Sequence, residues 1–559
     1  MGSWIEIVTK RWTLGWILCM LASLLCCVSC GNAHNTDKPV SQETNVDSDI
    51  DVSNFLVSVL DEPKTLDFQC TTIDYTIGLN CFNRLVEMQE GEDGAIGVVP
   101  SLAKSWEISD DGLVYTFHLR DDVTFSNGSP LTSSDVRYSF IRLLTHPKSC
   151  NRDIVRDIEG AKELESGDSD YLEGFRLIDD HNFSITLHQP FSAFLACLCM
   201  PGASILDQET TELAGDKFGH DPQSTVGTGP FVLRSWKSGA DMVLTANPTY
   251  WEGALDLKGL HLRFVNHPET LRKMYDDGQL DVLNLDDLGD LSEFFMHGDV
   301  YAKYLRDAQH IGIDYIALNE SIKPLGDVRV RKALQLALDR QTLLEAVYGG
   351  DGKVENGIYP HGLLGFNPNL EPIPYDEEQA KSLLSEAGYA DGFDLAVSLR
   401  ATTTKRQREL MNMVKVMWEK VGVRTSIEVL SEDEFMSRRK GGKLACYTAT
   451  WAADYDDPDN FVYTFFGSKE NAANRSICYT NEDVMKRVRA ARSIVDEEER
   501  IKEYDDLERI IVHDDAAWIP LFSKTRHYVI SDRLQNFTVS WNGWFETSYK
   551  YMSIKDSQN

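Results

Sequence analysis

The chain has 559 residues, beyond the length at which one hydrophobic core keeps growing, so two or more lobes are expected. Hydrophobic residues make up 42% and charged residues 26%, ordinary proportions for a folded protein that exclude wholesale disorder. The formal net charge of −33 argues against nucleic acid as a partner, because a protein that binds a polyanion needs a basic surface.

The N-terminus predicts export. A basic pair precedes a mostly apolar run over 12–25, about 14 residues against the ~20 that a membrane-spanning helix needs. Ser29 before Cys30 resembles a bacterial lipobox, in which the cysteine receives lipid, although Cys27 stands where that motif prefers leucine. We predict a lipoprotein signal peptide over 1–29 and lipidation at Cys30. The alternative is an uncleaved anchor, and either one places the body outside the cytoplasm on a membrane surface.

Residues 30–50 are polar and predict a flexible tether. Of the eleven cysteines, four lie in the leader, so seven remain in the body and cannot all pair. None has the paired CxxC spacing of a zinc site, and we predict no metal and no cofactor. A disulfide between Cys70 and Cys81 is an alternative that the sequence does not test.

The first clear elements of the body are a strand and a helix. Leu113, Tyr115, Phe117 and Leu119 alternate with more polar residues, which predicts a strand with one buried face. A helix is expected to follow in "SSDVRYSFIRLL", capped by Ser134 or Asp135.

The second half is rich in predicted helices. The stretch 326–350 places apolar residues on one face of a single helix that ends at paired glycines. A shorter helix begins after Asp376 and ends at Gly388, and 480–522 reads as two helices that lead into an apolar strand. This alternation of strands and helices predicts mixed α/β lobes.

The common catalytic signatures are absent from the sequence. It contains no GxSxG, HExxH or P-loop motif, and no GxGxxG between a strand and a helix. The glycines of "VGTGPF" (226–231) predict a tight turn or a hinge between lobes.

The stretch "WAADYDDPDNF" (451–461) holds four aspartates between aromatic residues. An EF-hand loop that starts at Asp454 needs glycine at its sixth position and glutamate at its twelfth, where Asp459 and Phe465 stand instead. An acid–base pair for hydrolysis, an anchor for a cationic ligand and a solvated acidic loop remain as interpretations.

Several motifs together resemble the family 5 extracellular solute-binding proteins, the peptide-binding components of bacterial ABC importers. They are, in chain order, "EPKTLDF", "VVPSLAKSWEISDDGLVYTFHLRDDVTFSNGSPLTSSDVRYSF", "VGTGPF", "NPTYW", "DDGQLDV", "ALNESIKPLGDVRVRKALQLALDR", "YDEEQAKSLLSEAGYADGF", "MWEKVGVRTSIEVL" and the aspartate stretch. The resemblance covers roughly 51–545.

The resemblance implies an α/β, two-lobed periplasmic-binding-protein-like fold of class II type that closes on its ligand about a hinge. It also implies an extra subdomain inserted in lobe I. The expected division is lobe I over 51–97, 225–312 and 520–559, the insert over 98–224, and lobe II over 313–519.

The resemblance also implies a ligand site. In the peptide binders an aspartate in a W-x-x-D stretch holds the ligand's α-ammonium group, and this motif falls on Trp451 and Asp454, with Tyr455 beside them. For the ligand carboxylate the dipeptide binders place an arginine ahead of the "VGV" segment, near Arg400 here. The nearby alternatives are Lys405, Arg406 and Arg408.

The predicted function is therefore capture of di- or oligopeptides outside the cytoplasm and delivery to an ABC permease and its ATPase. The protein is expected to be a lipid-anchored monomer, in the periplasm or on the outer cell surface, without enzymatic activity. One alternative keeps the fold and changes the solute to a nickel complex, haem or an opine. The remote alternative is a secreted acidic hydrolase.

Overall fold

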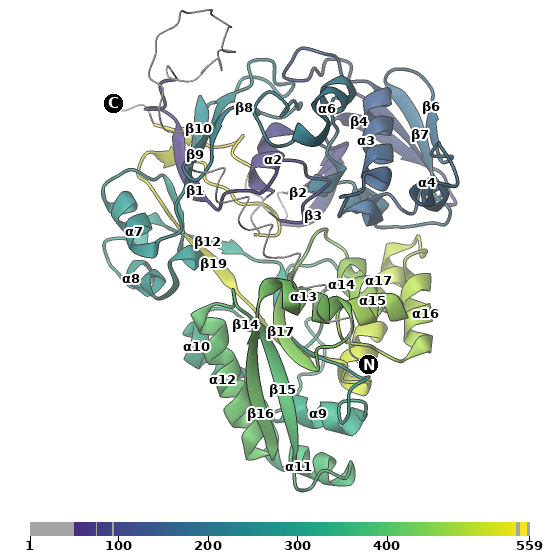
Figure 1. Cartoon of the computed structure of the whole chain (residues 1–559), viewed down its shortest axis with the longest axis vertical. Helices are drawn as coiled ribbons and strands as arrows, with labels where there is room; N and C mark the ends of the chain where they lie inside the picture. The colour runs from purple at the N-terminus through teal and green to yellow at the C-terminus, as the bar shows by residue number, and fades with distance from the viewer. Residues whose placement is uncertain (1–49, 74, 92–93, 544–547, 556–559) are drawn as a thin grey trace, which may run out of the picture. The chain divides into compact units, whose positions relative to one another are not determined.

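The computed structural model describes residues 50–73, 75–91, 94–543 and 548–555 (Figure 1). Asp51–Asn559 form one compact unit, distinct from Met1–Ile50. The predicted signal peptide, Cys30 and all but the last residue of the predicted tether lie outside the described residues. In the described part of the chain, no helix combines the length and apolar character needed to cross a membrane.

The first lobe is built on a four-stranded sheet in the order β1-β10-β9-β8. β1 pairs with β10 in parallel, and the other neighbours are antiparallel. The strands are β1 (Leu56–Leu60), β8 (Phe231–Lys237), β9 (Asp241–Ala246) and β10 (Gly259–Phe264). Their buried side chains pack with α2 (Thr76–Cys81) into one core.

The inserted subdomain has an antiparallel sheet of its own in the order β4-β5-β7-β6. Its strands are β4 (Ala103–Ile108), β5 (Val114–Leu119), β6 (Phe175–Leu177) and β7 (Asn182–Thr186). Phe183 stacks between Phe117 and Phe175, with ring centroids 5.3 and 5.0 Å apart. The alternating burial of β5 confirms the predicted strand, and α3 (Ser133–Thr145) contributes Phe140 to the same core.

The second lobe is built on a six-stranded sheet in the order β14-β18-β13-β17-β15-β16. The strands are β13 (Gly312–Leu318), β14 (Lys353–Val354), β15 (Phe393–Arg400), β16 (Val423–Leu430), β17 (Cys446–Ala452) and β18 (Trp518–Ser523). Along β13, Tyr315 and Ala317 enter one core while Ile316 and Leu318 enter another. Both faces of this strand are covered, so all its residues are buried.

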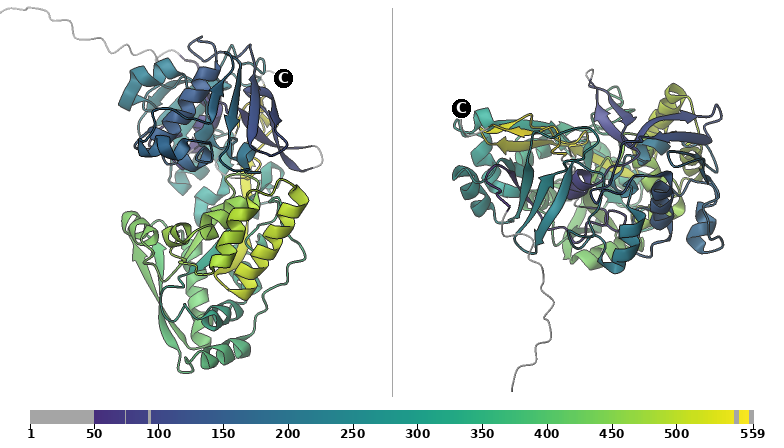
Figure 2. Two further views of the ribbon diagram at one scale, coloured as in Figure 1. Left: turned by 90° about the vertical axis from the view of Figure 1, so that its right-hand side faces the viewer. Right: turned by 90° about the horizontal axis from the view of Figure 1, so that it is seen from above.

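The helices of the second lobe fall into two groups that cover the two faces of its sheet. One group packs beside Trp418 and comprises α9 (Val328–Leu336), α10 (Arg340–Tyr348), α11 (Glu377–Glu386) and α12 (Lys405–Lys420). The other comprises α13 (Glu432–Lys440), α14 (Pro458–Phe466), α15 (Lys469–Asn474), α16 (Glu482–Ala491) and α17 (Glu497–Arg509). Figure 2 shows the yellow-green helices of this second group lying together.

A three-stranded sheet joins the two lobes, in the order β11-β19-β12. Its strands are β11 (Val282–Asn284), β12 (Leu305–Gln309) and β19 (Thr525–Ile530), labelled in part in Figure 1. The chain passes from β12 into β13 through 310–311 and returns from β18 into β19 through Lys524. Lys524 forms an ion pair of 3.0 Å with Asp314 of β13.

The remaining elements are short. They are the hairpin β2 (Val86–Glu90) and β3 (Ile96–Pro100), the pair β20 (Leu534–Gln535) and β21 (Ser553–Ile554), and helices α4 (Ala161–Ser166), α5 (Phe194–Cys197), α6 (Gln208–Ala214), α7 (Pro268–Asp276) and α8 (Ser292–Met296). Turns of 3-10 helix occupy Arg152–Ile154, Pro201–Ala203, Gly215–Lys217, Leu285–Leu291 and Ala302–Tyr304, and a π-helical turn follows α17 at Ile510–Asp514.

The predicted helices are present, with two corrections. The cap of α3 is Thr132, and Asp135 is the third helical residue that completes its capping box. The expected single helix over 326–350 is two helices, because the carboxylate of Asp339 accepts the Thr342 N–H and starts α10. Asp376 caps α11, and 480–522 folds as α16, α17 and β18, as predicted.

Three predicted domain boundaries fall inside strands. The 312/313 boundary separates Gly312 from the rest of β13, although Gly312 already pairs with Ala452 of β17. The 97/98 boundary divides β3, which pairs with β2 along its whole length. The 519/520 boundary divides β18, which pairs with β13 and β14 up to Ser523. Strand pairing therefore carries the second lobe to Ser523, and the division of the remaining chain stays a prediction.

The glycines of "VGTGPF" serve close packing in the first lobe. A Cβ on Gly227 would lie 2.1 Å from the carbonyl oxygen of Cys81, and one on Gly229 would lie 2.4 Å from its carbonyl carbon. Only glycine allows this approach. The hinge interpretation is wrong, since the chain crosses between the lobes at 310–311 and Lys524.

Candidate functional site

Asn460 organises the segment that follows β17. Its Oδ1 accepts hydrogen bonds from Trp451 Nε1 and from the Asp454 backbone N–H, each at 3.1 Å. Its Nδ2 donates to Asp454 Oδ2, also at 3.1 Å. Asn460 is buried in the first turn of α14, so one carboxamide fixes both the indole and the carboxylate of the predicted W-x-x-D motif.

α14 starts where its sequence dictates. Asp457 is the N-cap and its carboxylate accepts the Asp459 N–H at 2.9 Å, while Pro458 occupies the first helical position, where no N–H is needed. The helix therefore holds Asn460 directly behind the Asp454 segment.

Asp454 carries a half-buried carboxylate. Burial raises its pKa, and the hydrogen bond from Asn460 and the positive charge of Arg475 oppose that rise. Among the described residues, no basic side chain forms an ion pair with Asp454 within 4.0 Å. A cationic group that entered the site would supply the contact that the carboxylate lacks.

Arg475 stacks on the ring of Trp451. Its guanidinium carbon is 4.5 Å from the centroid of the Trp451 ring and 5.2 Å from that of Phe465. Burial lowers the pKa of Arg475, and the neighbouring charge of Arg439 lowers it further. The Nε of Arg439 is itself buried without a hydrogen-bond partner. The two arginines therefore form a cationic surface beside Asp454.

Arg400 reaches the margin of this surface. It ends β15, where its Nη1 lies 3.2 Å from Glu432 Oε1 and its guanidinium lies 4.9 Å from the centroid of Phe435. Burial raises the pKa of Tyr315, and the charges of Arg475, Arg439 and Arg400 all oppose that rise, so the three arginines surround one phenol. Arg400 already has an acidic partner there.

The other three predicted site alternatives lie elsewhere. Arg406 pairs with Glu293 at 2.8 Å, Lys405 approaches Glu409 on the same helix at 3.9 Å, and Arg408 donates to backbone carbonyls at the start of α12.

The remaining aspartates of the run are buried or bonded, which overturns their interpretation as a solvated loop. Asp457 pairs with Arg500, and both side chains are buried. Asp459 lies 3.1 Å from Arg492 and accepts a hydrogen bond from Tyr504. Because Asp457 and Asp459 are held by arginines, the hydrolase hypothesis loses two of its acids.

Asp456 serves the backbone. Its Oδ1 accepts the Leu364 N–H at 2.7 Å, and burial raises its pKa to about 6. Among the described residues, no three members of this run approach closely enough to form a metal site.

Tyr455 points away from Asp454. Its hydroxyl donates to Asp459 Oδ2 at 3.0 Å, and its buried ring packs in the core of the inserted subdomain. Arg492 strengthens the same junction, because it pairs with Asp157 of the insert at 3.0 Å and lies 4.0 Å from the centroid of Phe191. Tyr455 and Arg492 therefore connect the second lobe to the insert.

Asn460, Arg475 and Arg439 were not predicted as site residues from the sequence. Asn460 stands inside the quoted motif, and its place in the first turn after Asp457-Pro458 was a usable signal. No local signal marks the two arginines, because the fold of α13 and α15 beside β17 brings them to Trp451.

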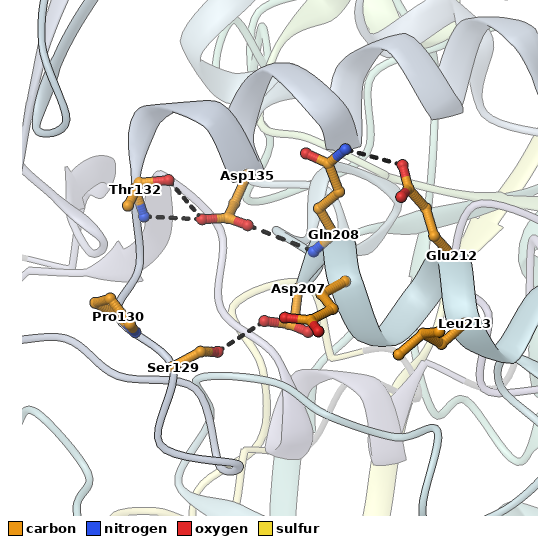
Figure 3. Close-up of a pocket in the computed structure, with 9 residues that line it drawn as sticks. Ser129, Pro130, Thr132, Asp135, Asp207, Gln208, Glu212 and Leu213 are labelled. Carbon is orange, nitrogen blue, oxygen red and sulfur yellow. Dashed lines mark hydrogen bonds between the residues drawn. The ribbon is translucent and has the colours of Figure 1, made fainter.

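A shallow pocket of about 510 Å³ lies elsewhere, in the inserted subdomain (Figure 3). Its acidic groups are occupied in capping, as Asp135 holds the Thr132 N–H and Asp207 caps α6 through the Thr210 N–H. Ser129 also donates to Asp207, and Gln208 to Glu212. The polar side chains that line this pocket therefore stabilise helix ends and neighbouring side chains.

Comparison with known proteins identifies the family of the chain. The family described as "Bacterial extracellular solute-binding proteins, family 5 Middle" matches residues 97–473. Heme-binding protein A of Haemophilus influenzae is 31% identical over 83% of this chain and 85% of its own length. The dipeptide-binding protein of Escherichia coli is 28% identical over 82% of this chain and 86% of its own.

Solved structures show the same fold. A periplasmic oligopeptide-binding protein from Borrelia burgdorferi superposes with a TM-score of 0.76 and 27% identity, over 90% of this chain and 99% of that one. The expected two-lobed periplasmic-binding-protein-like fold with an inserted subdomain is confirmed. The chain belongs to the bacterial extracellular solute-binding proteins of family 5.

Proposed function

We propose that this protein captures di- or oligopeptides between its two lobes and delivers them to the permease and ATPase of an ABC importer. The observation that carries the proposal is the Asp454 carboxylate, fixed by Asn460 beside Trp451 and without a basic partner among the described residues. A peptide's α-ammonium group matches such a carboxylate in charge and in hydrogen-bond donors.

The ligand's carboxylate is assigned to Arg475, with Arg439 beside it, in place of Arg400. The guanidinium of Arg475 rests on aromatic rings and has no ion pair within 4.0 Å among the described residues, whereas Arg400 already faces Glu432. A planar guanidinium can bond both oxygens of a carboxylate. Trp451 contacts Arg475 through its ring and Asn460 through its indole nitrogen, and it provides an apolar wall. Tyr455 does not contact the ligand in this proposal; it positions the Asp454 segment through its hydrogen bond to Asp459 and its packing against the insert.

The site binds and releases, and we assign it no catalytic step. The carboxylates nearest Asp454 in the sequence are held by arginines or backbone donors, so they provide no free acid–base pair.

The N-terminus completes the proposed arrangement. A lipid on Cys30 and the polar tether over 30–50 would hold a monomeric binding unit at a bacterial membrane, in the periplasm or on the outer cell surface. That position keeps the unit close to its permease while it searches for ligand.

A second candidate solute is haem. It is favoured by the 31% identity with a protein named heme-binding protein A. The geometry around Asp454 gives it less support, because a carboxylate matches an ammonium group and repels the propionates of haem.

Native mass spectrometry of the protein purified without added ligand distinguishes these candidates. We expect a series of adducts with peptide masses, which disappear on unfolding, and we expect calorimetry to show binding of short unblocked peptides to the emptied protein. A single porphyrin mass, or failure of every peptide in a mixed library to bind, would refute the peptide proposal.

A further inference from the structure

A cluster of metal-ligating side chains lies outside the Asp454 site. Asp67 and Cys70 come from the segment before α2, and His146 follows the last turn of α3. A carboxylate oxygen of Asp67, the Sγ of Cys70 and a ring nitrogen of His146 all lie within 4.8 Å of one another. Sulfur, imidazole nitrogen and carboxylate oxygen are the donors that zinc takes in proteins.

The Nδ1 atom of His146 presents its lone pair to the thiol. The Lys148 N–H donates to Nδ1 at 3.3 Å, so this nitrogen is an acceptor. The Sγ of Cys70 lies 3.2 Å from the same nitrogen. A zinc ion bonded to both atoms in tetrahedral geometry requires a separation of about 3.6 Å. To hold an ion in place of the thiol proton, the cluster needs a small increase of this separation and release of the Lys148 N–H from Nδ1.

A fourth donor lies beside the cluster. The Cys150 N–H donates to the carbonyl oxygen of Gln69 at 2.8 Å, and the exposed Cys150 Sγ lies 3.7 Å from the carbonyl oxygen of Cys70. This backbone contact fixes 149–151 against 69–70. Held beside Cys70 in this way, the Cys150 thiol is the candidate for the fourth donor.

Arg142 sets the charge of the cluster. It donates to both oxygens of Asp67, at 3.1 and 2.7 Å, and to Gln69 Oε1 at 2.6 Å. Two thiolates and one carboxylate carry three negative charges, and the guanidinium cancels one. The remaining two match a divalent cation. Arg142 also orients the Asp67 carboxylate, as outer partners of metal ligands do.

We propose that Cys70, His146, Asp67 and Cys150 bind a thiophilic divalent cation of the zinc class. Binding releases the thiol protons to solvent and forms bonds from the metal to sulfur, nitrogen and oxygen, without a change of oxidation state. The ion ties the segment before α2 in the first lobe to the end of α3 in the insert. This proposal is independent of the ligand bound at Asp454.

The test uses the full chain, reduced, treated with a chelator and titrated with Zn²⁺ in a calorimeter. We expect Cys70→Ser and His146→Ala each to weaken the affinity by at least about 100-fold relative to wild type, and Cys150→Ser by about 10-fold. Cys478→Ser is the matched control, since this half-buried thiol lies in the second lobe, and it should leave Zn²⁺ binding unchanged. All variants share the leader cysteines, so the differences report on this cluster.

Two further measurements separate a built site from a loss of folding. Co²⁺ should give a sulfur-to-metal charge-transfer band in wild type that disappears in Cys70→Ser. Zn²⁺ should raise the melting temperature of wild type and of Cys478→Ser, but not of Cys70→Ser or His146→Ala. Equal Zn²⁺ affinity in wild type, Cys70→Ser and His146→Ala would overturn the proposal. So would a Cys70–Cys150 disulfide in the native protein combined with no Zn²⁺ uptake after its reduction.

Discussion

At the scale of single residues, Asn460 gives the site its geometry. It holds the Trp451 indole, the Asp454 backbone and the Asp454 carboxylate through one buried carboxamide. Its Oδ1 is used twice and its Nδ2 once, so the carboxylate keeps its orientation before any ligand arrives. Preorganised charge of this kind avoids the cost of ordering a side chain during binding.

Replacement of Asp454 by asparagine tests the ammonium contact. The amide keeps the size and can still accept the bond from Asn460, but it removes the charge. Loss of a charge-assisted hydrogen bond of ~1.5–3 kcal/mol should weaken binding of an unblocked peptide by about 10- to 100-fold. Calorimetry measures the effect, with exposed Asp433→Asn on α13 as the control. An N-acetylated peptide should bind wild type and D454N equally weakly; a preserved preference for the free amine in D454N would contradict the assignment.

Arg475→Gln tests the carboxylate contact. Wild type should prefer a peptide with a free C-terminus over the same peptide as an amide, and R475Q should lose that preference, about tenfold or more, because the charged hydrogen bonds are gone. Arg400→Gln is the matched comparison and should retain the preference, since its guanidinium faces Glu432. The opposite result would return the role to Arg400.

At the scale of elements, α14 and α17 are joined by a buried ion pair between Asp457 and Arg500. Arg500→Met leaves the Asp457 charge buried without its partner, so we expect a loss of about 3–5 kcal/mol in the free energy of unfolding, measured by urea denaturation. Lys469→Met breaks an exposed ion pair with Glu482 and should change the free energy of unfolding by less than about 1 kcal/mol. A double variant Asp457→Asn, Arg500→Met should recover part of the loss; equal effects of R500M and K469M would contradict burial as the cause.

The elements show where sequence reasoning succeeds and where it fails. Periodicity predicted β5, and the capping residue Asp376 predicted the start of α11, because each of these signals lies within a few neighbouring residues. The break between α9 and α10 had a local signal, the Asp339 cap, which the apolar periodicity of the stretch masked. The buried partners of Asp457 and Asp459 had none, since Arg500 and Arg492 reach them only through helix packing.

The same distinction applies to the candidate site. The W-x-x-D motif could be located from the sequence because Trp451 and Asp454 are neighbours in the chain. The cationic surface could not, since Arg439 and Arg475 come from opposite sides of β17 in the chain. Their side chains meet only after α13, β17 and α15 have packed.

At the scale of the whole molecule, His527 responds to pH at the junction of the lobes. It lies on β19 and contacts Asp351 of the second lobe at 2.6 Å and Asp307 of β12 at 2.7 Å. The hydrogen bond to Asp351, joined by that to Asp307, raises the pKa of His527 to about 9. An unfolded histidine titrates near ~6.5, so the stabilisation is complete below that pH and is lost as the pH rises through about 9.

We therefore expect the free energy of unfolding to fall by up to about 3 kcal/mol between pH 7 and pH 10. The exposed carboxylate of Asp307 is screened by solvent, so its contact with His527 contributes the smaller part of this change. Urea denaturation across this range measures the slope. His527→Gln should flatten it, because the amide does not titrate. An unchanged slope in H527Q would assign the alkaline loss to other groups.

The contact that Arg492 makes between the insert and the second lobe bears on the rate at which ligand dissociates. This arginine joins Asp157 of the insert to Asp459, the residue that directly precedes Asn460 on α14. To move the insert away from the second lobe, the protein must separate a desolvated charge pair next to the residue that orients Asp454. Such a barrier mainly slows dissociation of the ligand and has little effect on the rate of association. We therefore expect the duration of each bound event, and with it the interval available for handover, to depend on a contact that touches no ligand.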